Sequence, residues 1–86
     1  MDRTGTFTVQ PNPVLDVANL RFEAKAVENV RIYITDARGA VVYNLPFKTS
    51  PGLNVLPIDM SAYSRGVYSV SIRGTDMLQT IQVVKQ

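Results

Sequence analysis

Cysteine and histidine are both absent from the 86 residues of this chain. Their absence excludes disulfides, Ser-His triads, Cys-His dyads and the usual zinc ligand sets, and it removes the commonest general base. Paired carboxylates are the catalytic groups that remain, because glycoside hydrolysis needs only two. Nearly all the acids fall in expected turns or strand ends, where a carboxylate usually caps a backbone N–H or is solvated. These acids are Asp16, Glu23, Glu28, Asp36, Asp59 and Asp76.

The spacing of these acids also argues against calcium. No two of them lie closer than five residues apart, whereas an EF-hand loop needs oxygen ligands at alternating positions. We therefore expect no metal site, no cofactor and no catalytic residue, and we predict that the chain is not an enzyme.

Long hydrophobic runs and clustered charge are absent too. The apolar runs are far shorter than the ~20 residues of a membrane-spanning helix, so we expect no direct membrane span. The net charge is +2 and the basic residues are spread singly, which argues against nucleic acid as a partner. Residues 1–5 carry an acid and lack the apolar core of a secretory signal peptide. We expect residues 1–6 to be a linker or a remnant of a longer protein whose own signal lies upstream.

Apolar residues instead recur with a period of two, and no window of eleven or more residues keeps them at helical spacing. The pattern predicts about seven short strands, at the roughly 8–12-residue spacing typical of a two-sheet sandwich. We therefore predict an all-β, immunoglobulin-like antiparallel β-sandwich with Greek-key connections over residues 7–86. The expected strands span residues 7–9, 16–22, 30–35, 40–45, 56–60, 68–73 and 77–85.

Turn residues separate these strands. Residues 10–13 read Gln-Pro-Asn-Pro and should form a stiff turn, because proline lacks an N–H and restricts the residue before it. Residues 36–39 read Asp-Ala-Arg-Gly, which predicts a type I turn in a hairpin. The proline-bracketed residues 46–52 are long enough to carry the chain to the opposite sheet. Pro57 indicates an edge strand, whereas residues 68–73 are typical of a central one.

Two glycines and the last strand have simple structural explanations beside functional ones. Gly39 and Gly66 each lie where the chain must reverse before a strand, and a positive φ at each is sufficient to explain them. Residues 81–86 end the chain with the strand pattern still running. This strand is either a template for pairing with another protein or the strand that completes its own sheet, and the residues alone leave both open.

Four short segments occur in one order along the chain. They are residues 9–13 with Pro11, Asn12 and Pro13; residues 30–33 leading to Gly39 and residues 41–42; residues 58–61 followed by Gly66, Val67 and Tyr68; and the closing Val83, Val84 and Lys85. In order, spacing and terminal position they resemble the C-terminal sorting domain of the type IX secretion system of Bacteroidota, the Por secretion system tail family. The likeness covers residues 9–86. The chain departs from the family pattern at Gln10, where the family often has Tyr or Leu, and in carrying a single lysine in its last strand.

The resemblance implies an immunoglobulin-like domain at the C-terminus of a secreted protein, covalently preceded by a cargo domain. It implies transit through the periplasm and the type IX outer-membrane translocon, with uptake by an outer-membrane shuttle protein. A sortase-like cell-surface peptidase would then cut near or upstream of Gly5, leaving the cargo at the outer membrane and cell surface, commonly joined to an anionic lipopolysaccharide, or extracellular. The residues that the resemblance assigns to translocon recognition are Pro11, Asn12, Pro13, Gly39, Gly66, Val67, Tyr68, Val83, Val84 and Lys85.

A rival interpretation rests on two tyrosines. Tyr33 lies in the outward phase of its expected strand, where its ring can stack on a sugar or contact a partner. Together with Tyr43 it would line a sugar platform, and the chain would be an ancillary carbohydrate-binding or spacer sandwich of a secreted polysaccharide-degrading enzyme. A glycan-binding measurement on the domain separates the two interpretations.

Overall fold

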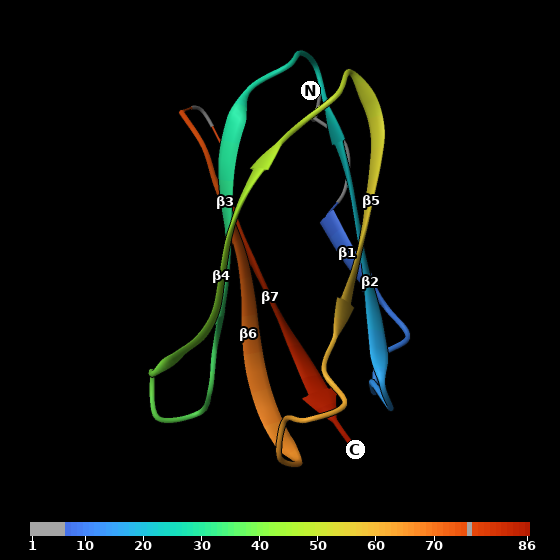
Figure 1. Cartoon of the computed structure of the whole chain (residues 1–86), viewed down its shortest axis with the longest axis vertical. Helices are drawn as coiled ribbons and strands as arrows, with labels where there is room; N and C mark the ends of the chain where they lie inside the picture. The colour runs from blue at the N-terminus through green and yellow to red at the C-terminus, as the bar shows by residue number, and fades with distance from the viewer. Residues whose placement is uncertain (1–6, 76) are drawn as a thin grey trace.

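Seven β-strands build the part of the chain that the computed structural model describes, residues 7–75 and 77–86 (Figure 1). They form two antiparallel sheets, one in the order β1-β2-β5 and the other in the order β4-β3-β6-β7. The strands are β1 (Phe7–Gln10), β2 (Val17–Ala24), β3 (Asn29–Thr35), β4 (Val41–Lys48), β5 (Gly52–Asp59), β6 (Gly66–Arg73) and β7 (Leu78–Lys85). The predicted all-β sandwich of about seven strands is confirmed.

The connections between β2 and β3, β4 and β5, and β5 and β6 each pass from one sheet to the other, as Greek-key connections do. The described residues contain no helix long and apolar enough to cross a membrane.

Alternate residues of the strands fill the space between the sheets. On β3, Val30, Ile32 and Ile34 are at most 4% exposed, while the residues between them point outward. Ala18 and Leu20 on β2 meet them from the other sheet and are equally buried. The period of two therefore identified the core face of these strands correctly, because successive side chains of a strand point to opposite faces.

The turn of residues 36–39 has the predicted form. The Gly39 N–H donates to the Asp36 carbonyl at 2.9 Å, which closes a four-residue turn between β3 and β4. Asp36 Oδ1 also accepts hydrogen bonds from the backbone N–H groups of Arg38 and Ala40, at 2.9 and 3.0 Å. Aspartate at the first position thus satisfies backbone donors that the tight turn leaves without partners.

The crossover after β4 is shorter than predicted. The chain was expected to leave the strand pattern at residues 46–52, but β4 continues through Pro46 to Lys48. β4 is an edge strand, where a missing N–H is tolerated. Thr49 holds the remaining connection, because its Oγ1 accepts from the Glu28 N–H at 3.0 Å and donates to the Ala26 carbonyl at 2.8 Å.

β5 also begins earlier than the predicted residue 56. Its inward position 54 carries Asn54, a polar residue that interrupts the apolar alternation on which the prediction depended. The Asn54 side chain is buried and is bonded to the backbone N–H and carbonyl of Ser50, both at 2.9 Å. Pro57 lies in this edge strand and β6 lies between β3 and β7, as predicted.

The sandwich has two distinct ends (Figure 1). At one, the Phe7 end, the rings of Phe7, Phe22 and Phe47 pack edge to face, with centroids 6.5 and 6.1 Å apart. At the other, the Gln86 end, lie the β1–β2, β3–β4 and β5–β6 connections together with the end of β7. Apart from residues 30–33, which begin β3 nearer the Phe7 end, the segments singled out by the sequence gather at the Gln86 end.

Candidate functional site

The β6–β7 pair brings two of the sequence segments into contact. Gly66 lies opposite Lys85, Val67 opposite Val84, and Tyr68 opposite Val83. The corner that precedes β6 and the end of the chain therefore form one continuous surface, although they are separated in the sequence.

The segment Pro11 to Pro13, the first of the four along the chain, is hydrogen-bonded to β7 as well. Asn12 Oδ1 accepts from the Val84 N–H at 3.0 Å and Asn12 Nδ2 donates to the Gln82 carbonyl at 3.3 Å. The Asn12 carboxamide thus pairs with an N–H and a carbonyl of β7, as the backbone of a neighbouring strand would. Pro11 and Pro13 flank it, and both of the peptide bonds that precede these prolines are cis.

Val14 extends this contact with its backbone. Its N–H donates to the Val84 carbonyl at 2.7 Å, and its carbonyl accepts from the Gln86 N–H at 2.9 Å. Val14 forms a parallel bridge with Lys85. We call residues 12–14, bonded in this way to β7, the clip. The last residues of β7 are therefore paired on both sides and are not a free template for a foreign strand.

Val14 is a residue that the sequence prediction missed. Its side chain is completely buried, and it belongs to the hydrophobic core. The signal was present as an apolar residue directly after Pro13, but its pairing with a strand some 70 residues later has no local pattern. Each hydrogen bond of the clip contributes about 0.5–1.5 kcal/mol net, so the clip and the buried valine together fix the end of the chain.

Gly39 and Gly66 have the positive φ predicted for them, +89° and +149°. A Cβ at either position would meet no heavy atom within 4 Å, so backbone conformation and not lack of space requires glycine there. Gly39 lies in the β3–β4 hairpin at the Gln86 end (Figure 1). A depression of about 360 Å³ separates residues 36–38 of this hairpin from residues 64–68.

Tyr68 and Val83 are structural parts of this end. Val83 is completely buried and Tyr68 is 7% exposed. The Tyr68 hydroxyl donates to the Ser64 carbonyl at 2.7 Å, which closes the corner before β6. Its ring lies 5.6 Å from that of Tyr63, whose pKa is raised by burial and by the neighbouring Tyr43. Tyr68 and Val83 therefore support the exposed surface of the Gln86 end and are not part of it.

The exposed part of this end is apolar with a basic border. Leu15, Val67 and Val84 are 62%, 43% and 42% exposed, and we call them the end patch. Leu15 and Val84 line a depression of about 630 Å³ together with Arg65 and Lys85. Lys85 is largely buried, and its Nζ donates to the main-chain oxygen of Gln86 at 2.8 Å.

Two of the carboxylates weighed as catalytic candidates are turn caps. The Arg38 side chain, through its hydrogen bond, and the Ala40 N–H hold the pKa of Asp36 below its usual value. The backbone N–H of Ser61 donates to Asp59 Oδ1 at 2.9 Å and lowers the pKa of Asp59 in the same way. Among the described residues, no three acids, histidines or cysteines gather as metal ligands would.

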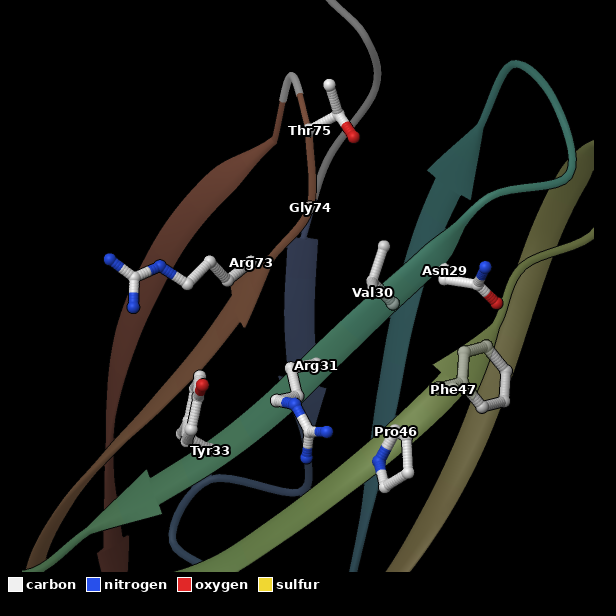
Figure 2. A pocket seen from close by; sticks show the side chains of 9 residues that line it. All are labelled: Asn29, Val30, Arg31, Tyr33, Pro46, Phe47, Arg73, Gly74 and Thr75. Atoms are coloured by element: carbon white, nitrogen blue, oxygen red, sulfur yellow. The ribbon is translucent and has the colours of Figure 1, made fainter.

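The predicted sugar platform of Tyr33 and Tyr43 is wrong. Tyr33 points outward from β3 (Figure 2), but Tyr43 lies opposite Ile34 and packs against the core. The two rings are therefore on opposite faces of one sheet. The sequence contained the signal, since Tyr43 shares its phase with Leu45 and Phe47, which also pack inward.

Comparison with known proteins gives one family. The family model described as "Secretion system C-terminal sorting domain" matches residues 8–86. A search of the curated proteins gives no match to the chain. The matched range includes β2 to β7, nearly all of β1, the clip and the end patch.

Proposed function

Because the chain belongs to the family of secretion system C-terminal sorting domains, we propose that residues 7–86 are a folded export signal that the type IX machinery reads at the Gln86 end. The family places the chain in the type IX system, behind a cargo, with export toward the outer membrane or cell surface. The observation that carries the proposal is the clip, in which the Asn12 side chain joins the first family segment to the last.

The end patch is the surface that we assign to the contact with the export machinery. Leu15, Val67 and Val84 offer apolar area, and Arg65 borders it with positive charge, whereas Lys85 lies largely buried at its edge. Such a surface fits a partner with an apolar centre and acidic groups around it, since apolar cores with charged rims are typical of protein interfaces. In this proposal the outer-membrane shuttle protein of the translocon is that partner, after transit through the periplasm.

Removal of the domain would take place at the opposite end. The proposed cut near or upstream of Gly5 lies outside the described residues, but β1 begins at the Phe7 end, away from the clip. A sortase-like cell-surface peptidase would therefore reach the linker while the end patch is still held. The domain itself would catalyse nothing and would need no cofactor.

The test is an export assay on a reporter that carries an N-terminal signal peptide and ends in this chain, in a type IX-competent host. Val84→Asp should abolish export, because it places a charge in the centre of the apolar patch. Val55→Asp is the matched control, since Val55 is similarly exposed (46%) but lies on β5 in the other sheet. Asn12→Ala should reduce export, because it removes both side-chain hydrogen bonds of the clip.

Thermal unfolding of each purified variant shows whether the fold survives. Equal export of folded Val84→Asp and Val55→Asp would overturn the assignment of the end patch. Full export of Asn12→Ala would show that recognition does not depend on the clip.

A further inference from the structure

The outer face of the four-stranded sheet places two arginines directly opposite each other. Arg31 on β3 pairs with Arg73 on β6. Tyr33 follows on the same face of β3, and its side chain lines the same depression as the two arginines (Figure 2). Like charges opposite each other on adjacent strands destabilise a sheet, so this arrangement needs a reason.

None of the four strands of this sheet carries an acid, and the carboxylate of Glu28, just before β3, lies against Gly74 without an ion pair to either arginine among the described residues. The sequences of β3, β4, β6 and β7 contain no aspartate or glutamate, and Lys48 on β4 and Lys85 on β7 add two further cations. Among the described residues, no carboxylate lies within salt-bridge distance of Arg31 or Arg73, and Arg31 is bonded to the neutral Asn44 at 2.8 Å. Within the described part of the chain, neither guanidinium group is held by a carboxylate, and each keeps N–H donors that can bind an anion.

The two arginines line a depression of about 560 Å³. Tyr33 and Pro46 supply apolar surface on the outer face, as Figure 2 shows, and the inward-packing Val30 and Phe47 complete the lining. The volume falls within the roughly 300–1,000 Å³ typical of small-ligand sites and exceeds what a single acidic side chain would fill. We call this site the arginine depression.

We propose that the arginine depression binds an acidic saccharide, with Arg31 and Arg73 holding a sugar carboxylate and the Tyr33 ring lying against the apolar face of the sugar. A guanidinium group matches a carboxylate with two parallel hydrogen bonds. An aromatic ring beside it offers a flat apolar surface with a polar tip. Tyr33 cannot form a neutral sugar platform with Tyr43. Its position beside two arginines suits an acidic sugar instead.

The arginine depression is independent of the proposed export surface. Arg73 pairs with Leu78 at one end of the β6–β7 ladder, whereas Gly66 pairs with Lys85 at the other. The depression therefore lies toward the Phe7 end, and a variant of the end patch should leave it intact.

The experiment is an NMR titration of the isotope-labelled full chain with trigalacturonic acid at low salt. Maltotriose is the neutral control, because it has the same number of sugar rings and no carboxylate. We expect amide shifts confined to residues 29–33 and 71–75 and binding that weakens as salt is added. Arg31→Gln and Arg73→Gln should each weaken binding at least about tenfold, since a hydrogen-bonded charge contributes about 1.5–3 kcal/mol.

Matched variants separate the sources of affinity. Arg31→Lys keeps the charge but loses the planar fork, so its affinity should lie between those of the parent and Arg31→Gln. Arg21→Gln removes a cation from the other sheet and should change nothing. Val84→Asp should bind trigalacturonic acid as the parent does. The export proposal and the saccharide proposal can therefore fail independently of each other.

Several outcomes would overturn the proposal. Equal shifts with maltotriose would show that charge plays no part, and unchanged affinity in Arg31→Gln and Arg73→Gln would remove the arginines from the site. Absence of shifts at saturating trigalacturonic acid would exclude the ligand class. If an acidic peptide of Glu residues bound at the same amides more tightly than trigalacturonic acid, the site would belong to a protein partner instead.

Discussion

The two ends of the β6–β7 ladder differ in how the sequence encodes them. At the Gln86 end, residues that carry the family likeness meet through backbone pairing, a buried core and one side-chain amide, Asn12. At the Phe7 end, the arginine depression is assembled from residues on β3, β4 and β6, of which only residues of β3 belong to a segment that carries the likeness. Short segments therefore mark most residues of the first end and fewer of the second, while pairing between segments far apart in the sequence brings the residues of both ends together.

The largest expected effect tests whether the Gln86 end depends on its buried clip. Val14→Asp would bury a carboxylate without a partner, which we expect to cost about 3–5 kcal/mol. The whole domain has roughly 4–13 kcal/mol of stability. The free energy of unfolding from urea titration should therefore fall by a large part of its value, or the domain should be unfolded without denaturant.

Leu15→Asp is the control for this variant. Leu15 is the next residue and is 62% exposed, so the same substitution there should change the unfolding free energy by no more than about 0.5 kcal/mol. It should nevertheless reduce export, because Leu15 belongs to the end patch. If the two variants were equally stable, Val14 would not be part of the core in solution.

Two glycines at opposite ends of β6 sharpen the comparison. Backbone conformation requires the first, Gly66, and lack of space requires the second, Gly74. Gly66→Ala should cost about 1–3 kcal/mol through its φ of +149°, although space around it is open. D-Alanine at 66, introduced by chemical synthesis, should be tolerated, since a D-residue favours positive φ. Gly74→Ala should cost about 1–3 kcal/mol by overpacking, because its Cβ would collide with the Glu28 side chain and lie 2.9 Å from Val30 Cγ1.

A double-mutant cycle distinguishes the two causes. In a Val30→Ala background the cost of Gly74→Ala should fall, whereas the cost of Gly66→Ala should stay the same. Equal coupling of both glycines to Val30 would contradict this division between contact and backbone strain.

Local patterns were enough to predict the sheets and several turns. The alternation of Val30, Ile32 and Ile34 identified the core face, and Asp36 and Gly39 identified the hairpin, because each of these features is encoded by residues close together in the chain. The starting point of β5 was missed at Asn54, where a buried polar group bonded to backbone takes an apolar position.

Long-range pairings account for what the sequence could not predict. Nothing near Asn12 indicates that its side chain will bond to Val84, and nothing near Arg31 indicates that Arg73 will lie opposite it. The first depends on where the β1–β2 connection meets β7, and the second on the register of β3 and β6, where a shift of one residue would turn a side chain to the other face. The error at Tyr43 had a different cause. Tyrosine suggested a sugar-binding ring, but the alternation of β4 places this residue on the inward face.

Acid should loosen the Gln86 end first, and this is the smallest effect that we expect. The pKa of Asp36 is lowered mainly by its hydrogen bond with Arg38, and that of Asp59 mainly by the Ser61 N–H. A carboxyl group whose pKa is lower in the folded state stabilises the fold above its unfolded pKa, and this contribution is lost as the pH falls through the folded pKa. Below about pH 4, amide exchange in residues 36–40 and 59–63 should therefore rise before exchange around Phe22 and Phe47. The double variant Asp36→Asn and Asp59→Asn should lose this pH dependence, and an unchanged acid response would show that other groups cause it.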